Sequence, residues 1–213
     1  TFNNCISYNN LKGWDLGQGG TDGSLDIMYK IINSTAYNNK WGMNLNAAGS
    51  GIANYTGNIK FYLINNIIRD NTNYGSEIYC GPYNLYAVHN VYDNNGWLSP
   101  TDQQKANLRV YPCTSDSQDI NVYLYNNIFY KPSGQYNFTV SRHDSSLTGD
   151  PPSNYTIDSD YNAWVSKGTE TAFVMWAFFG DDDPSTTYPY NNVGNTSGNW
   201  YIWYSYDTSQ HDG

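Results

Sequence analysis

Short stretches of alternating apolar and polar residues recur along this chain, and none of them keeps helical spacing. Segments 58–64 and 120–125 show the pattern: both are rich in β-branched and aromatic residues, and apolar side chains fall at every second position. Windows of about 11 residues nowhere show the i, i+3, i+4 spacing of an amphipathic helix. The pattern predicts an all-β fold built from many short strands.

A motif in which Asn is followed by four residues and a second Asn repeats along the chain. Successive copies are 29, 33, 24, 37 and 33 residues apart, so each interval fits one turn of a solenoid with a loop of variable length. The copies begin at Asn4, Asn33, Asn66 and Asn90, then without the closing Asn at Asn127, and in diverged form at Asp160.

Asparagine suits a repeated bend for two physical reasons. It tolerates the left-handed backbone conformation, and its side-chain amide can bond to the same Asn one coil above to form a ladder. We therefore predict a right-handed parallel β-helix of about five coils. Another β-solenoid or a β-propeller is the alternative.

The repeat divides the chain into two parts of a single domain. We assign residues 1–163 to the coils and residues 164–213 to a β-rich segment that caps the C-terminal end. Within that segment, 173–179 and 200–204 are predicted strands. The first repeat starts almost at Thr1, so we expect either further coils upstream or another molecule to cover that end.

One row of polar residues is the best candidate site. Asp15, Asn44 and Glu77 stand eleven residues after the first three anchors in similar apolar contexts, and Arg109 occupies the same context in the next coil. Because the flanking apolar residues point inward, strand alternation directs the four polar side chains outward in one row.

Two interpretations of this row are open. Asp15 and Glu77 are separated by two coils, roughly 9–10 Å, which is near the carboxylate spacing of inverting glycosidases. Arg109 would then bind a sugar acid or stabilise developing charge, with Asn44 contacting the substrate. In the other interpretation the row only solvates the sheet, and Glu77 and Arg109 form an ordinary surface ion pair.

A second column consists of tyrosines placed four residues before successive anchors. Mostly apolar neighbours on both sides predict that these rings face outward, where they would bind sugar rings or another subunit. Stacking that merely stabilises the sheet is an equally good interpretation. The column comprises Tyr29, Tyr62, Tyr86 and Tyr123.

Charge and hydropathy narrow the class of partner. The net charge of -9 and the pI near 4.4 argue against nucleic acid and against an anionic membrane surface. No apolar run approaches the roughly 20 residues of a membrane-spanning helix. A polyanionic substrate would need a bound cation, and Asp181–Asp183 is read either as a Ca²⁺ site or as a solvated acidic turn.

Cysteines and sequons are compatible with a secreted or cell-surface location. Cys80 and Cys113 lie about one coil apart, within reach of a disulfide, whereas Cys5 is expected to be a small buried residue. Glycosylation sequons are about as frequent as composition alone would give. They lie at Asn33, Asn54, Asn137, Asn154 and Asn195.

The segments 4–16 and 33–39 resemble family 9 pectate lyases, and the likeness extends over roughly residues 3–100. It implies a right-handed β-helix and a polysaccharide partner. Asp15 matches one calcium ligand of that family. Leu11 and Lys12 stand where the family has acidic residues, and Asn44 stands where it has the catalytic lysine. The resemblance therefore speaks against calcium-dependent pectate lysis in this chain.

We expect an extracellular β-helix that interacts with a polysaccharide, as a glycosidase or lyase relative acting through Asp15 and Glu77. The alternative is a non-catalytic surface or filament subunit that associates end to end into homo-oligomers.

Overall fold

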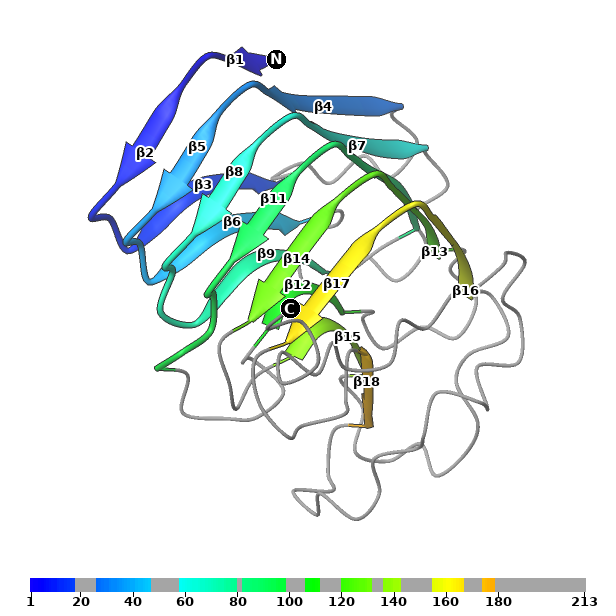
Figure 1. The fold of residues 1–213 in the computed structure, drawn as a ribbon. Coiled ribbons are helices and arrows are strands. Elements are labelled where there is room, and N and C mark those ends of the chain that lie inside the picture. The colour runs from blue at the N-terminus through cyan, green and yellow to red at the C-terminus, as the bar shows by residue number, and fades with distance from the viewer. Residues whose placement is uncertain are drawn as a thin grey trace.

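The computed structural model describes residues 1–17, 26–46, 58–79, 82–98, 106–111, 120–131, 136–142, 155–166 and 174–178. These residues form strands and no helix, and the strands stack into three parallel sheets of six strands each (Figure 1). No described segment forms a helix of the length and hydropathy that a membrane span requires.

Each coil contributes one strand to each sheet, and strands three apart in chain order pair with each other. Sheet A contains β1 (Phe2–Asn3), β4 (Ile27–Ile32), β7 (Ile59–Ile64), β10 (Tyr83–Val88), β13 (Ile120–Tyr125) and β16 (Tyr155–Asp160). Sheet B contains β2 (Ile6–Tyr8), β5 (Thr35–Tyr37), β8 (Ile67–Arg69), β11 (Val91–Asp93), β14 (Ile128–Lys131) and β17 (Ala163–Ser166). Sheet C contains β3 (Lys12–Gly17), β6 (Trp41–Asn46), β9 (Tyr74–Tyr79), β12 (Ala106–Tyr111), β15 (Tyr136–Arg142) and β18 (Val174–Phe178).

The predicted all-β solenoid with parallel strands is confirmed. Six coils are present rather than about five, because β16, β17 and β18 add a complete set of strands to the three sheets. The stack thus extends past residue 163, the expected end of the coils, as far as Phe178. The rest of the predicted capping segment, including the strand at 200–204, lies outside the described residues.

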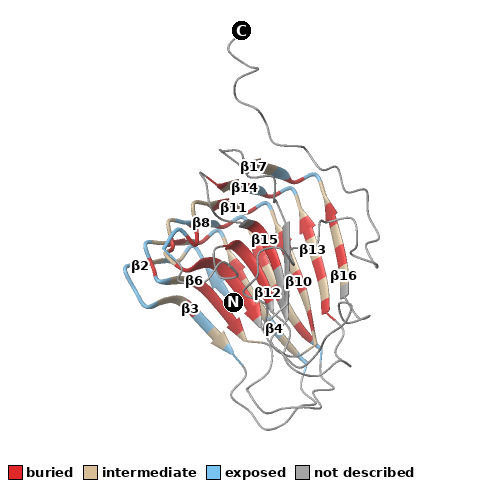
Figure 2. Ribbon diagram, turned by 90° about the horizontal axis from the view of Figure 1, so that it is seen from below, coloured by how far each residue is buried: buried red, intermediate tan, exposed pale blue. Residues whose placement is uncertain are grey.

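Strict alternation along the sheet A strands β7, β10 and β13 separates the core from the surface. In β7 the side chains of Ile59, Phe61 and Leu63 are buried, whereas those between them are only partly covered. Figure 2 shows the same alternation of buried and partly exposed positions on the neighbouring strands of sheet A. Parallel pairing keeps these positions in register from coil to coil, so the core is a continuous column of apolar layers.

The corner between sheets A and B turns through a residue with positive φ in all six coils, and the corner between sheets B and C does so in the first four. Among residues other than glycine, those with a short polar side chain such as Asn or Asp meet this requirement at the lowest cost, which explains the repeated Asn. The corner between sheets A and B uses Asn4, Asn33, Asn65, His89, Asn126 and Tyr161, and the corner between sheets B and C uses Asn9, Asn38, Asp70 and Asn94. The structural equivalent of Asn33 is therefore Asn65, one residue before the anchor expected at Asn66.

From the second coil onward, the residue after each left-handed position in the corner between sheets A and B points inward and forms the first ladder, which begins with Ser34 and continues with Asn. Asn90 shows its bonding: its Oδ1 accepts from the backbone N–H and the Nδ2 of Asn66, at 2.9 and 3.0 Å. Its Nδ2 donates to the Leu63 carbonyl at 2.7 Å and to Asn127 Oδ1 at 3.1 Å. All members are buried, and they are Ser34, Asn66, Asn90, Asn127 and Asn162.

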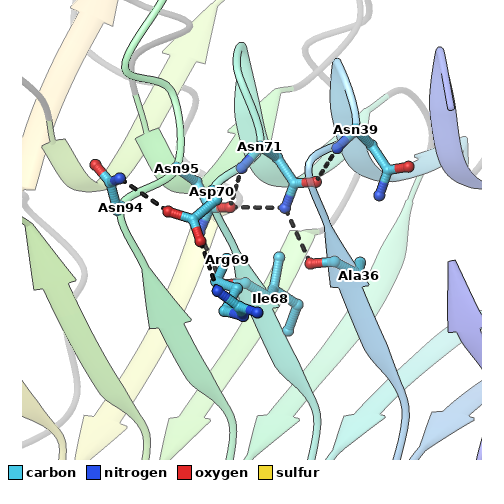
Figure 3. Close-up of polar contacts among 8 residues, drawn as sticks. All are labelled: Ala36, Asn39, Ile68, Arg69, Asp70, Asn71, Asn94 and Asn95. Carbon is cyan, nitrogen blue, oxygen red and sulfur yellow. Dashed lines mark hydrogen bonds and ion pairs between the residues drawn. The ribbon is translucent and has the colours of Figure 1, made fainter. Parts of the chain in front are cut away.

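A second Asn ladder runs along the corner between sheets B and C (Figure 3). Asn71 Oδ1 accepts from the Asn39 backbone N–H at 3.0 Å, and its Nδ2 donates to Asn95 Oδ1 at 2.7 Å and to the Ala36 carbonyl at 3.2 Å. The members of this ladder are Asn39, Asn71, Asn95, Asn107 and Asn137.

The second ladder needs a glycine beside each corner Asn. A Cβ on Gly42 would lie 2.2 Å from the Gly75 carbonyl oxygen and 2.8 Å from Asn71 Nδ2, so no side chain fits there. From the fourth coil onward, Asn107 replaces the glycine in register and its own amide occupies the ladder. The ladder therefore stays continuous, because its amides come from corner residues in the earlier coils and from a strand residue at Asn107.

Removing one rung of the first ladder should destabilise the fold strongly. Asn90→Ala removes the acceptor of the Asn66 backbone N–H and of one Asn66 amide proton, and the donor to the Leu63 carbonyl. Each buried group that loses its partner costs about 1–3 kcal/mol. We expect the free energy of unfolding to fall by about 3 kcal/mol or more in urea denaturation. Asn84→Ala is the control, because Asn84 belongs to a ladder on the partly exposed outer face and should lose less than about 1 kcal/mol.

The glycine requirement predicts a compensating pair. Gly42→Asn should destabilise the protein by about 3 kcal/mol, since the new side chain would meet both the Gly75 carbonyl oxygen and the Asn71 amide. Adding Asn71→Gly moves the amide from the corner to the strand, as Asn107 does naturally. It removes the contact with the amide but not the one with the backbone oxygen, so it should restore part of the loss. Equal denaturation midpoints for the single and double variants would contradict this explanation.

Candidate functional site

The predicted outer row lies on sheet C. Strand pairing places Asp15 beside Asn44, Asn44 beside Glu77, and Glu77 beside Arg109. The alternate positions, such as Met43 in β6, belong to the core. The register therefore brings all four residues together on the face of sheet C that points away from the core.

The sequence pattern did not predict a second column of outward side chains on the same face. Lys12, Trp41 and Tyr74 lie side by side, three positions before the row. They share its face because the intervening glycine, whose Cβ would point along the stack, interrupts the alternation. The sequence does contain a signal for this column, since each of the three residues directly precedes a glycine, at Gly13, Gly42 and Gly75. We call Lys12, Asp15, Trp41, Asn44 and Tyr74 the sheet C site.

Hydrogen bonds connect the polar members of the sheet C site. Lys12 Nζ pairs with Asp15 Oδ2 at 2.8 Å, Asn44 Nδ2 donates to Asp15 Oδ1 at 2.7 Å, and Tyr74 Oη donates to Asn44 Oδ1 at 3.1 Å. Partial burial opposes ionisation of Asp15, but the two donors prevail and hold the pKa of its carboxyl below the ordinary value. Asp15 is therefore a carboxylate at neutral pH.

Trp41 organises the aromatic part of the site. Its ring stacks on Tyr74 with centroids 6.2 Å apart, and the Lys12 and Lys40 ammonium groups lie 5.4 and 5.3 Å from its centroid. These contacts cover the ring faces, so Trp41 fixes Lys12 in position rather than offering a face for a ligand.

The side chains of the row become more buried from Asp15 toward Arg109. The Asp15 side chain is 53% exposed, whereas the side chains of Glu77 and Arg109 are 10% and 3% exposed. Arg109 NH1 pairs with Glu77 Oε1 at 2.5 Å, so the expected surface ion pair is a buried one. The next member in register, Thr139, is completely buried.

This geometry favours binding over acid–base catalysis. A glycosidase needs a protonated general acid, but Lys12 and Asn44 stabilise the charged form of Asp15. Glu77 is enclosed and paired with Arg109, so its carboxylate is not open to a substrate. The Asp15–Glu77 acid/base pair stays a prediction without geometric support.

Breaking the buried ion pair should cost far more than breaking the exposed one. Arg109→Met leaves the Glu77 carboxylate buried without this partner, and we expect a loss of about 3 kcal/mol or more in the free energy of unfolding. Lys12→Met is the matched control and should cost less than about 1 kcal/mol. Urea denaturation measures both. Equal losses would mean that the Glu77–Arg109 pair is not enclosed.

The predicted tyrosine column is correct for Tyr62, Tyr86 and Tyr123 and wrong for Tyr29. The three stack on the outer face of sheet A, with centroids 4.7 and 4.8 Å apart. Tyr29 instead pairs with Phe61 and stacks on it at the edge of the core. The error follows from the anchor: the residue equivalent to Asn66 is Ser34, so counting four residues back from Asn33 reaches Tyr29 instead of Lys30 and inverts the face.

Because the rings of Tyr62, Tyr86 and Tyr123 stack on one another, the faces that they turn toward each other are not available to a ligand. Tyr86 lies between Tyr62 and Tyr123, nearly parallel to both, and the Lys30 ammonium covers the far side of Tyr62 at 5.5 Å from its centroid. The column presents ring edges and hydroxyl groups to solvent. Burial and the two neighbouring phenols raise the pKa of Tyr86. A sugar ring therefore has no free tyrosine face in the middle of the column.

The remaining site predictions fare differently. Within the described residues, no group of three or more His, Cys, Asp or Glu side chains gathers around Asp15 or elsewhere to hold a metal ion. Cys5 is partly buried beside the core, as a thiol. Cys80, Cys113 and Asp181–Asp183 lie outside the described residues.

The two glycosylation sequons that lie within the described residues differ in burial. Asn33 is exposed, whereas Asn137 is 1% exposed and its amide belongs to the second ladder, so a glycan there is incompatible with this fold. Asn54, Asn154 and Asn195 lie outside the described residues.

Comparisons with protein-family models, with curated proteins and with solved structures find no significant match to this chain. The resemblance to pectate lyases therefore rests on the sequence motifs alone.

Proposed function

We propose that this chain is a secreted or cell-surface right-handed parallel β-helix that binds a polysaccharide at the sheet C site without cleaving it. The observation that carries the proposal is the pair of Lys12, which is partly exposed, and Asp15, which is exposed; the buried Asn44 holds Asp15 in a fixed position. The resemblance to polysaccharide lyases suggests the same class of ligand.

Lys12 and Asp15 retain bonding capacity for a ligand. Lys12 Nζ uses one of its three protons on Asp15, and each Asp15 oxygen can accept a second bond. A carboxylate and an ammonium within reach of each other match the adjacent donor and acceptor hydroxyls of a sugar. Because the groups are already ordered by Trp41 and Tyr74, little entropy is lost on binding.

Electrostatics restrict the ligand. With a net charge of -9, the protein repels a polyanion at long range, and the described residues gather no metal-binding cluster to offset this. A neutral polysaccharide fits better than a polyuronate.

Substitution of Asp15 tests the proposal. Asp15→Asn removes the charge that strengthens bonds to sugar hydroxyls, and we expect affinity for a neutral polysaccharide to fall about tenfold in affinity electrophoresis. Asp93→Asn on sheet B is the matched control and should bind like the wild type. Failure of every neutral polysaccharide in a panel to bind, or equal loss in both variants, would exclude this site. Release of reducing ends or unsaturated products would exclude the non-catalytic assignment.

A further inference from the structure

The outer face of sheet A carries charges at its two ends. Its central column is in register across five coils and consists of Lys30, Tyr62, Tyr86, Tyr123 and Asp158. All five side chains are partly exposed. The column therefore begins with a cation in the second coil, passes through three tyrosines, and ends with a carboxylate in the sixth.

The flanking columns repeat this polarity. Lys60 in the third coil adds a second cation, and Asp160 in the sixth adds a second carboxylate. Between them, the face carries amides on one side of the tyrosines and apolar side chains on the other. The first flanking column is Met28, Lys60, Asn84, Asn121 and Thr156, and the second is Ile32, Ile64, Val88, Tyr125 and Asp160.

These charges are not neutralised within the face. Lys30 lies over the Tyr62 ring, and Asp158 accepts a hydrogen bond from the Tyr125 hydroxyl. Within the part of the chain that the structure describes, neither Lys30 nor Asp158 forms an ion pair. Each end of the column thus keeps a charge that a partner of opposite sign can meet.

We propose that this face binds a second copy of the chain in antiparallel orientation. A two-fold axis along the strands at the level of β10 brings the second coil of one copy opposite the sixth coil of the other. Lys30 then faces Asp158 of the second copy, Tyr62 faces Tyr123, and Tyr86 faces its own equivalent. The sequence of the column, cation, three tyrosines, carboxylate, is complementary to its own reverse.

The charges select this arrangement among the face-to-face pairings. If the axis ran along the solenoid instead, each coil would face its own equivalent, and Lys30 would oppose Lys30. Like charges at both ends would repel. In the antiparallel pair Lys30 attracts Asp158 at both ends, and the tyrosine edges and the apolar side chains of Ile64 and Val88 supply the central contact, since Tyr gives a large contact area at low entropy cost.

Charge reversal tests the pairing. Analytical ultracentrifugation of the wild type should show a monomer–dimer equilibrium that weakens as salt is added. Lys30→Glu and Asp158→Lys should each weaken the dimer about tenfold or more, because each creates two like-charge contacts per dimer. Arg69→Glu, a reversal on sheet B, is the control and should leave the dimer unchanged.

Mixing the two variants is the decisive step. Lys30→Glu protein and Asp158→Lys protein present opposite charges to each other at both ends of the antiparallel pair, so the mixture should recover wild-type association. A misfolded variant could not be rescued in this way. A monomeric wild type, stacks that grow without limit, or variants that fail to recover on mixing would overturn the proposal.

A mixture of Lys30→Glu with wild type that associates more tightly than either protein alone would show that Lys30 faces Lys30, and would also overturn it. The proposal uses a face separate from the sheet C site, so polysaccharide binding by Asp15 does not depend on the outcome.

Discussion

A buried asparagine amide that bonds to the next coil is the interaction on which this fold depends. Within a strand, backbone groups pair with the neighbouring coil directly. At the inward residue of each corner, the backbone N–H has no carbonyl opposite it, and the side-chain oxygen of the next coil accepts it instead. The same amide donates back to a carbonyl of the preceding coil. Without these rungs, each of the corners that carries one would bury unsatisfied polar groups, and each such group would cost stability.

The ladders also determine what the surface presents. Because each corner is fixed relative to the next coil, the strands keep one register, and outward positions line up into columns over the whole stack. The glycine that makes room for a corner amide interrupts the alternation in sheet C, which brings Lys12 and Trp41 onto the same face as Asp15. The polar site and the tyrosine column are thus both consequences of packing inside the corners.

The sequence alone predicts the parallel solenoid and the outer row of sheet C, because the apolar residues that flank Asp15, Asn44 and Glu77 identify their face independently of any anchor. The row is correct even though Asn66 was the wrong anchor, since seven positions separate Asp70 from Glu77 where six separate Asn38 from Asn44. No comparable set of flanking residues identified the face of Tyr29, so the anchor offset of one residue led to the wrong prediction that it points outward. Alternation predicts the direction of a side chain but not what covers it, so the burial of Glu77 and Arg109 was beyond the sequence.

Hydrogen exchange of the backbone amides of Asn66, Asn90 and Asn127 tests the central claim most directly. These N–H groups donate to side-chain oxygens of the next coil rather than to backbone carbonyls. If the amide ladder is a structural equivalent of the sheet, they will exchange as slowly as the core strand amides of Leu85 and Val122 under native conditions. Exchange orders of magnitude faster than in the strands would show that the ladder opens independently, and that the sheets alone hold the coils together.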